Sequence, residues 1–72
     1  MKNLVNMKDV KPGDKLCCDD AFTCATPGFA YVVRKDEKSD AMFINCRDGR
    51  HYLDGQKQDD GTLAGMTRAT ND

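Results

Sequence analysis

Turn signals recur at short intervals along this chain and limit every regular element to a few residues. Glycine reaches positive φ without steric cost, proline fixes φ, and aspartate hydrogen-bonds its own backbone, so Pro-Gly and Asp-Gly pairs favour turns. The segments between these pairs are too short for ordinary helices and have the length of strands. The pairs that divide the 72 residues are Pro12-Gly13, Pro27-Gly28, Asp48-Gly49, Asp54-Gly55 and Asp60-Gly61.

Short apolar runs between the turns predict the strands. The run 29–34 has apolar or small residues on both faces, which is typical of a central strand. The run 41–47 places Met42, Ile44 and Cys46 on one face, because successive side chains of a strand point to opposite sides. Phe43, Asn45 and Arg47 then share the other face. The predicted strands are 14–18, 21–25, 29–34, 41–47, 50–53 and a weak one at 62–66.

The connections between these runs can also be predicted. Asp48-Gly49, between Arg47 and Arg50, predicts a two-residue type I′ hairpin that pairs Cys46 with His51. The polar segment 35–40 is expected to be a solvated loop, and 54–60 an irregular one. Asn6 is expected to cap a single 3₁₀ turn over residues 7–9, with Leu4, Val5 and Met7 sharing a face of the N-terminal turn. The ends, 1–3 and 68–72, are expected to fray.

These elements predict an all-β fold in one domain, 1–72, with an ordered core at about 7–67. Five or six short strands are too few for a two-sheet sandwich of roughly 100 residues. An antiparallel meander closed into a small SH3-like barrel fits better, because closure removes exposed strand edges.

A resemblance supports the same fold. The segment Met7–Leu16, with its Pro-Gly-Asp turn before a strand, resembles the opening of SH3-like barrels, including KOW-type nucleic-acid modules and FeoA-type iron-transport accessory proteins. The segment Cys46–Leu53 is similar to hairpins of small phage and prophage proteins. The first resemblance implies an SH3-like barrel, and the second implies that the chain is encoded by a phage or prophage.

Composition narrows the function. Eleven basic residues against 12 acidic ones give a net charge of −1, whereas nucleic-acid binders usually carry a basic excess. No apolar run is long enough for a membrane span or a signal peptide, so we expect a cytoplasmic protein with reduced thiols. A chain this short has little apolar material from which to line a ligand cavity, so neither an enzyme nor a small-molecule substrate is expected.

The four cysteines and the single histidine allow several interpretations. The first is that three cysteines are reduced, small buried hydrophobes, because they share strand faces with the apolar residues Leu16, Phe22 and Ile44. These cysteines are Cys18, Cys24 and Cys46. This interpretation leaves the protein without a cofactor. A zinc-stabilised module is the alternative, and a disulfide a further one. Catalysis by Cys46 with His51 as base is not expected, because no third residue is evident to orient the histidine. The zinc ligands would be Cys18 (or Cys17), Cys24, Cys46 and His51.

We therefore expect a non-enzymatic macromolecule-binding module. A protein-binding regulator or inhibitor is the leading prediction, because polar loops on a small rigid scaffold are where binding residues usually lie. The alternative is a nucleic-acid-binding barrel of the KOW or OB kind, since alternating aromatic and arginine side chains can stack bases. The candidate binding residues are Arg34, Lys35, Phe43, Asn45, Arg47, Arg50 and Tyr52.

Overall fold

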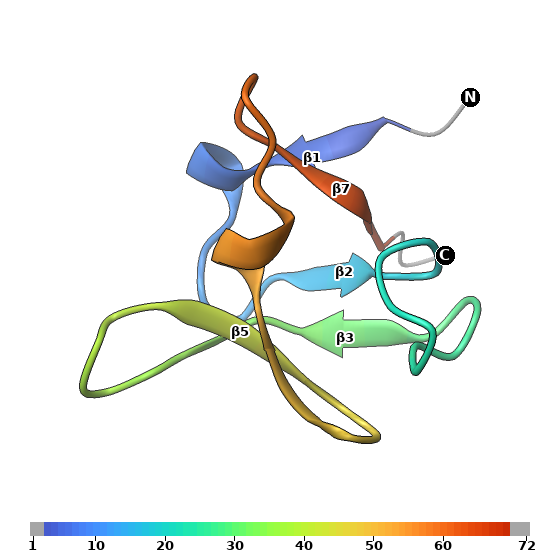
Figure 1. The fold of residues 1–72 in the computed structure, drawn as a ribbon, viewed down its shortest axis with the longest axis horizontal. Helices are drawn as coiled ribbons and strands as arrows, with labels where there is room; N and C mark the ends of the chain where they lie inside the picture. The colour runs from blue at the N-terminus through green and yellow to red at the C-terminus, as the bar shows by residue number, and fades with distance from the viewer. Residues whose placement is uncertain (1–2, 70–72) are drawn as a thin grey trace.

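The computed structural model describes residues 3–69, which form an all-β fold of two antiparallel sheets (Figure 1). One sheet has the strand order β1-β7-β2-β3 and the other the order β4-β5-β6. The two sheets share no hydrogen-bonded ladder, so the predicted barrel is not closed. In chain order the elements are β1 (Leu4–Asn6), η1 (Met7–Asp9), β2 (Lys15–Cys17), β3 (Ala30–Val32), β4 (Arg34–Lys35), β5 (Met42–Cys46), β6 (Gly49–Tyr52), η2 (Leu53–Gln56) and β7 (Thr62–Arg68).

The connectivity is largely the predicted meander. Strands β2 and β3 pair as neighbours, and β4, β5 and β6 follow one another in their own sheet. The exception is β7, which returns to lie between β1 and β2. The weak run at 62–66 therefore becomes a seven-residue interior strand, because pairing on both sides compensates for its low apolar content.

The N-terminal prediction is confirmed in one part and wrong in another. Asn6 caps η1, and its side-chain oxygen accepts a hydrogen bond from the Lys8 amide at 3.1 Å. Leu4 and Val5 belong to β1 and not to a helical turn, because β7 offers them a pairing partner.

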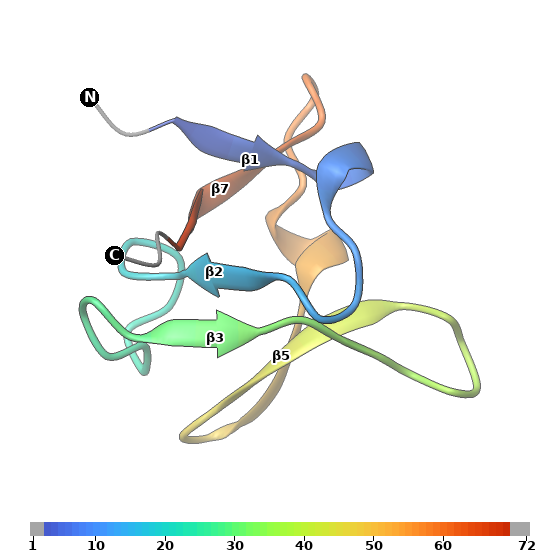
Figure 2. The same cartoon turned by 180° about the vertical axis from the view of Figure 1, so that it is seen from behind.

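The run 21–25 forms no strand, contrary to the prediction. Residues 18–29 make successive tight turns, closed by amide-to-carbonyl hydrogen bonds from Ala21 to Cys18 and from Ala25 to Phe22, each 3.1 Å long. These local bonds satisfy backbone groups that a strand would have needed a neighbour to satisfy. Residues 18–29 form the curled loop beside the ends of β2 and β3 in Figures 1 and 2.

The run 29–34 is divided between the two sheets instead of forming a central strand. It splits at Val33 into β3, an edge strand of the larger sheet, and β4, an edge strand of the smaller one. Val33 is almost fully buried, and its amide donates to the Asp14 carbonyl at 2.8 Å. The chain bends at this residue because its side chain must enter the core between the sheets.

The C-terminal prediction is wrong for Arg68, which is the last residue of β7. Its guanidinium donates to the Asp9 carbonyl at 3.1 Å and lies 3.4 Å from the Asp14 carboxylate. The fraying expected at 1–2 and 70–72 lies outside the described residues. The loop predicted at 54–60 includes most of η2.

The core lies where the two sheets and η2 meet. Strand β5 runs obliquely to β3 in both views, and η2 contacts β5, β6 and β7 (Figures 1 and 2). Among residues 3–69, no helix has the length and apolar character needed to cross a lipid bilayer. The largest fully buried side chains are those of Leu16, Cys18, Val33, Ile44, Leu53, Leu63 and Met66.

Candidate functional site

The β5–β6 hairpin turns one residue earlier than predicted. Cys46 pairs with Gly49, so the turn consists of Arg47 and Asp48. A type I′ turn over Asp48-Gly49 would need positive φ at both residues. Here only Gly49 has it, at +127°, and the earlier turn keeps Asp48 out of the region that non-glycine residues avoid.

This turn changes the pairing partners without changing the strand faces. Phe43 pairs with Tyr52 and with Arg34, and Asn45 pairs with Arg50. Residues that are directly opposite in a ladder share a face. The five side chains therefore lie on one face of β4-β5-β6. The alternate residue Ile44 is fully buried in the core, so this is the outer face of the sheet.

A groove of about 950 Å³ runs along this outer face. Its walls include residues 32–38 and Pro12-Gly13, together with Phe43, Asn45 and Arg50. Lys35 lines the groove and lies 3.4 Å from the Asp40 carboxylate. Two other predicted binding residues do not line the groove. Tyr52 is beside it, because its hydroxyl donates a hydrogen bond to the groove residue Asp36. Arg47 lies in the exposed hairpin turn.

Phe43 is buried on the outer face, although it takes no part in the core. Its exposed fraction is 4%, yet it lies outside the core cluster between the sheets. The Arg50 guanidinium carbon is 4.3 Å from the ring centroid, and the Tyr52 ring centroid is 5.5 Å away. The arginine and the tyrosine therefore cover the Phe43 ring, and its face is not available for stacking a base.

Asp36 organises the groove, and sequence reasoning missed it because it lies in the segment predicted to be a solvated loop. Its carboxylate accepts hydrogen bonds from the Tyr52 hydroxyl at 2.9 Å and from Arg50 at 3.3 Å. It also accepts from the Lys38 amide at 2.8 Å. The short spacing between Asp36 and the Lys38 amide is an Asx-turn pattern, and it is the only sequence signal for this role.

Asp36 gives the fold an acid-sensitive contact. The Lys38 amide, the Tyr52 hydroxyl, the Ser39 amide and the Arg50 charge lower the pKa of the Asp36 carboxyl below its ordinary value of 3.8. A carboxyl with a lowered folded-state pKa stabilises the fold above its unfolded pKa and loses that contribution as pH falls through the folded pKa. We expect Asp36→Asn to lower the urea midpoint at about pH 7 and the difference from wild type to shrink toward zero in acid.

Glu37→Gln is the matched control for that experiment. It removes the same charge from the neighbouring residue, which is exposed and accepts no side-chain hydrogen bond from residues 3–69. A urea midpoint that differs between Asp36→Asn and wild type by the same amount at every pH would contradict the assignment.

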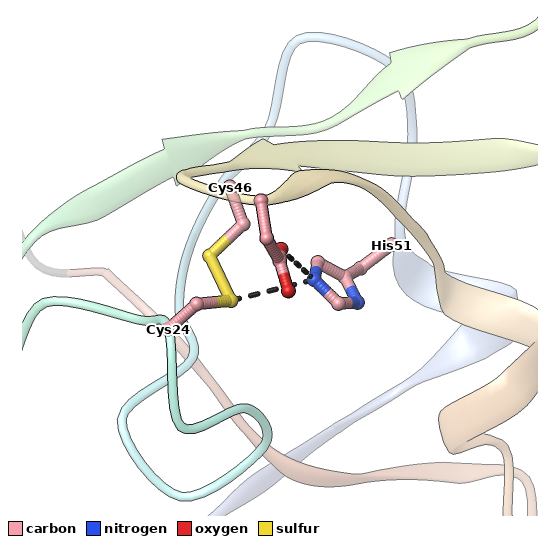
Figure 3. Close-up of side chains that lie close together, drawn as sticks. Cys24, Cys46 and His51 are labelled. Carbon is pink, nitrogen blue, oxygen red and sulfur yellow. Dashed lines mark hydrogen bonds and ion pairs between the residues drawn. A yellow bond between two sulfur atoms is a disulfide. The ribbon is translucent and has the colours of Figure 1, made fainter.

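A second cluster lies on the inner side of the same hairpin. Cys24 and Cys46 form a disulfide with a Cα–Cα distance of 6.4 Å, so the prediction that both are reduced core residues is wrong. Both are only half-buried, since each lies at the margin of the core. Figure 3 shows His51 turned toward the two sulfurs, with its Nε2 3.3 Å from Cys24 Sγ. The same nitrogen is 2.7 Å from the Asp48 carboxylate.

The other two cysteines lie outside this cluster. Cys18 is fully buried in the core, as predicted, so it is not placed with the other zinc candidates. Burial, with smaller contributions from neighbouring Cys17 and Asp19, raises the pKa of the Cys18 thiol to about 12. Cys18 is therefore a neutral, unreactive thiol. Cys17 is a half-buried free thiol.

Sequence reasoning placed Cys24, Cys46 and His51 in one candidate set and missed Asp48. The hairpin turn brings Asp48 to His51, because a residue in the turn can reach back over the strand that follows. The sequence favours a turn role for Asp48, because it precedes a glycine. Comparison of the chain with family models, with curated proteins and with solved structures gives no match.

Proposed function

We propose that this chain is a small non-enzymatic protein-binding module that docks an acidic segment of a partner protein in the outer groove. The observation that carries the proposal is the gathering of basic side chains around the groove by β4, the loop that follows it and β6. Arg34, Lys35, Lys38 and Arg50 line it. Such a cluster attracts carboxylates even on a chain whose net charge is slightly negative.

The cations differ in their availability. Arg50 is held by Asp36 and Lys35 by Asp40. Among residues 3–69, Arg34 and Lys38 have no ion-pair partner, and both are exposed. A partner would therefore engage Arg34 and Lys38 first, and the planar Arg34 guanidinium can bind a carboxylate in a bidentate manner.

A protein partner is favoured over a nucleic acid by the state of the aromatic residues. Binding of a single strand relies on exposed rings on which bases stack. The Phe43 ring is covered by Arg50, and Tyr52 is 39% exposed with its hydroxyl bound to Asp36. The groove also contains the carboxylates of Asp36 and Glu37, which repel a continuous phosphate backbone more than separate acidic side chains.

The remaining details of the function are part of the same proposal. We expect a regulator or inhibitor of another protein, acting in the cytoplasm and encoded by a phage or prophage. This expectation rests on the resemblance of the hairpin segment. The meander around a shared core also suits an SH3-like arrangement, in which binding surfaces form between a sheet and its loops.

Arg34→Glu is expected to weaken binding of a short polyglutamate peptide about tenfold, equivalent to about 1.4 kcal/mol. The reason is that the substitution replaces one of the two groove cations without an ion-pair partner among residues 3–69 by a negative charge, which repels the peptide. Fluorescence anisotropy at low and high salt measures the effect, with an oligothymidylate as the nucleic-acid ligand. The control Lys57→Glu makes the same charge change at an exposed residue outside the groove.

Two outcomes would contradict the proposal. If Lys57→Glu weakened peptide binding as much as Arg34→Glu, the attraction would depend on net charge and not on the groove. If the oligothymidylate bound more tightly than the peptide and Arg34→Glu abolished its binding, the groove would be a nucleic-acid site.

A further inference from the structure

Four side chains with metal-binding atoms converge where the loop 18–29 meets the β5–β6 hairpin. Cys24 comes from the loop, Cys46 from the end of β5 and His51 from β6 (Figure 3). Asp48 comes from the turn between β5 and β6. Their ligand atoms all lie within 4.8 Å of one another. We propose that, once the disulfide is reduced, Cys24, Cys46, Asp48 and His51 form a tetrahedral Zn²⁺ site, so that the same residues hold either a disulfide or a metal.

The arrangement around His51 distinguishes a metal site from a catalytic one. In a thiol–histidine–carboxylate relay, the thiol and the carboxylate bind opposite ring nitrogens, so that the carboxylate orients the base. Here Cys24 Sγ and the Asp48 carboxylate both approach Nε2. Because both partners contact the same nitrogen, the carboxylate cannot orient the imidazole toward the thiol as a relay requires.

The spacing of the atoms suits zinc. Zinc bonds of about 2.0–2.3 Å place the ligands of a tetrahedral site about 3.3–3.8 Å apart. The Cys24 Sγ–His51 Nε2 distance is 3.3 Å. The Asp48 carboxylate is hydrogen-bonded to Nε2 at 2.7 Å, which is shorter than this ligand spacing. On binding zinc the carboxylate would move away from Nε2, and its place on an exposed turn allows this movement. Reduction releases the two sulfurs from each other, so that each can take its own position on the metal.

The surroundings hold the histidine in place and leave the site accessible. The Phe22 ring stacks on the imidazole with a centroid distance of 4.1 Å, which fixes the ring plane and keeps Nε2 pointed at the sulfurs. The Asp48 side chain is 64% exposed and that of His51 25%. A metal ion can therefore enter from solvent without opening the core.

The chemistry of the exchange balances with a dithiol as reductant. A dithiol such as dithiothreitol gives two electrons and two protons to the Cys24–Cys46 bond and becomes a disulfide itself. The two thiols then lose their protons to solvent as their sulfurs bind Zn²⁺, while Nε2 of neutral His51 and the Asp48 carboxylate supply the remaining bonds. In the reverse direction, a disulfide oxidant such as oxidised dithiothreitol takes two electrons from the two thiolates and two protons from solvent. It becomes the dithiol, the Cys24–Cys46 bond re-forms and the ion is released.

The test is metal titration of the reduced protein, with Co²⁺ as a spectroscopic probe and Zn²⁺ in competition with a chromophoric chelator. We expect one ion per chain, a thiolate-to-cobalt charge-transfer band and the intense visible bands of tetrahedral cobalt. The oxidised protein should show none of these. Asp48→Asn and His51→Gln should each weaken Zn²⁺ binding about tenfold or more, since even outer contacts of metal sites have effects of this size.

The chain provides a matched control for the cysteine ligands. Cys24→Ser and Cys46→Ser should abolish the charge-transfer band, whereas Cys17→Ser, which removes a thiol outside the cluster, should bind as wild type does. Circular dichroism of each reduced variant checks folding, and Asp48→Asn alters only an exposed turn. The proposal is wrong if the reduced wild type lacks the band, if Cys24→Ser keeps it, or if Asp48→Asn or His51→Gln retains wild-type affinity.

Discussion

Replacing Gly65 by alanine is expected to lower the free energy of unfolding by about 2–5 kcal/mol, a large share of the stability of a small domain. Gly65 lies within β7 with φ of +74°, a conformation that costs an alanine about 1–3 kcal/mol. A Cβ at this position would also lie 2.5 Å from the Ala21 amide nitrogen and from the Asp20 carbonyl carbon. Both are backbone atoms, so no side chain can rotate to relieve the clash.

Gly55→Ala is the control for this prediction. Its added Cβ would meet nothing within 4 Å, and its φ is not positive. Urea and thermal unfolding of both variants measure the difference, which for a domain of this size corresponds to a melting temperature lower by about 8–40 °C in Gly65→Ala. Equal stability of the two variants would mean that the loop 18–29 does not pack against β7 as described.

Breaking the Cys24–Cys46 disulfide is expected to lower the free energy of unfolding by about 3 kcal/mol in metal-free buffer. The bond joins residues 22 apart in the sequence, and it restricts the unfolded chain by closing a loop of this length. Cys24→Ser in the oxidised protein tests this by urea unfolding with a chelator present, so that metal binding does not mask the loss.

The control for this prediction is Cys17→Ser, which leaves the disulfide intact and should change stability by less than about 0.5 kcal/mol. Reduction of the wild type should reproduce the effect of Cys24→Ser. If the reduced and oxidised wild type unfolded at the same urea concentration, the pairing of Cys24 with Cys46 would be excluded as a source of stability.

Local patterns in the sequence predicted much of the fold. The alternation over 41–47 correctly separated Ile44, in the core, from Phe43 and Asn45 on the outer face. Asn6 was correctly identified as the cap of η1. Each of these features depends on neighbours within a few residues, so a short stretch of sequence is enough to predict it.

Features that depend on distant parts of the chain could not be predicted. The demand for glycine at Gly65 comes from the backbone of residues 20–21, and the interior place of β7 from two strands far away in sequence. The division of the run 29–34 between two sheets accompanies the burial of Val33 in the core and its hydrogen bond to Asp14. No local pattern encodes these long-range contacts.

In both candidate sites, the sequence predicted the parts that depend on local patterns and missed those that depend on distant contacts. The outer-face residues were found because strand alternation groups them, but the role of Asp36 depends on Tyr52 and Arg50 across the sheet. The thiol cluster was found only in part. Cys24 lies in the run 21–25, where a strand was predicted and a loop is observed, and its pairing with Cys46 depends on how that loop folds over the hairpin.

The central claim is that the groove beside Arg34 binds a protein partner, and affinity purification from the native host with paired variants tests it most directly. Wild type and Lys57→Glu, after nuclease treatment, should retain the same specific protein, and Arg34→Glu should lose it. Retention of that protein by all three baits, or loss of all specific material on nuclease treatment, would contradict the claim.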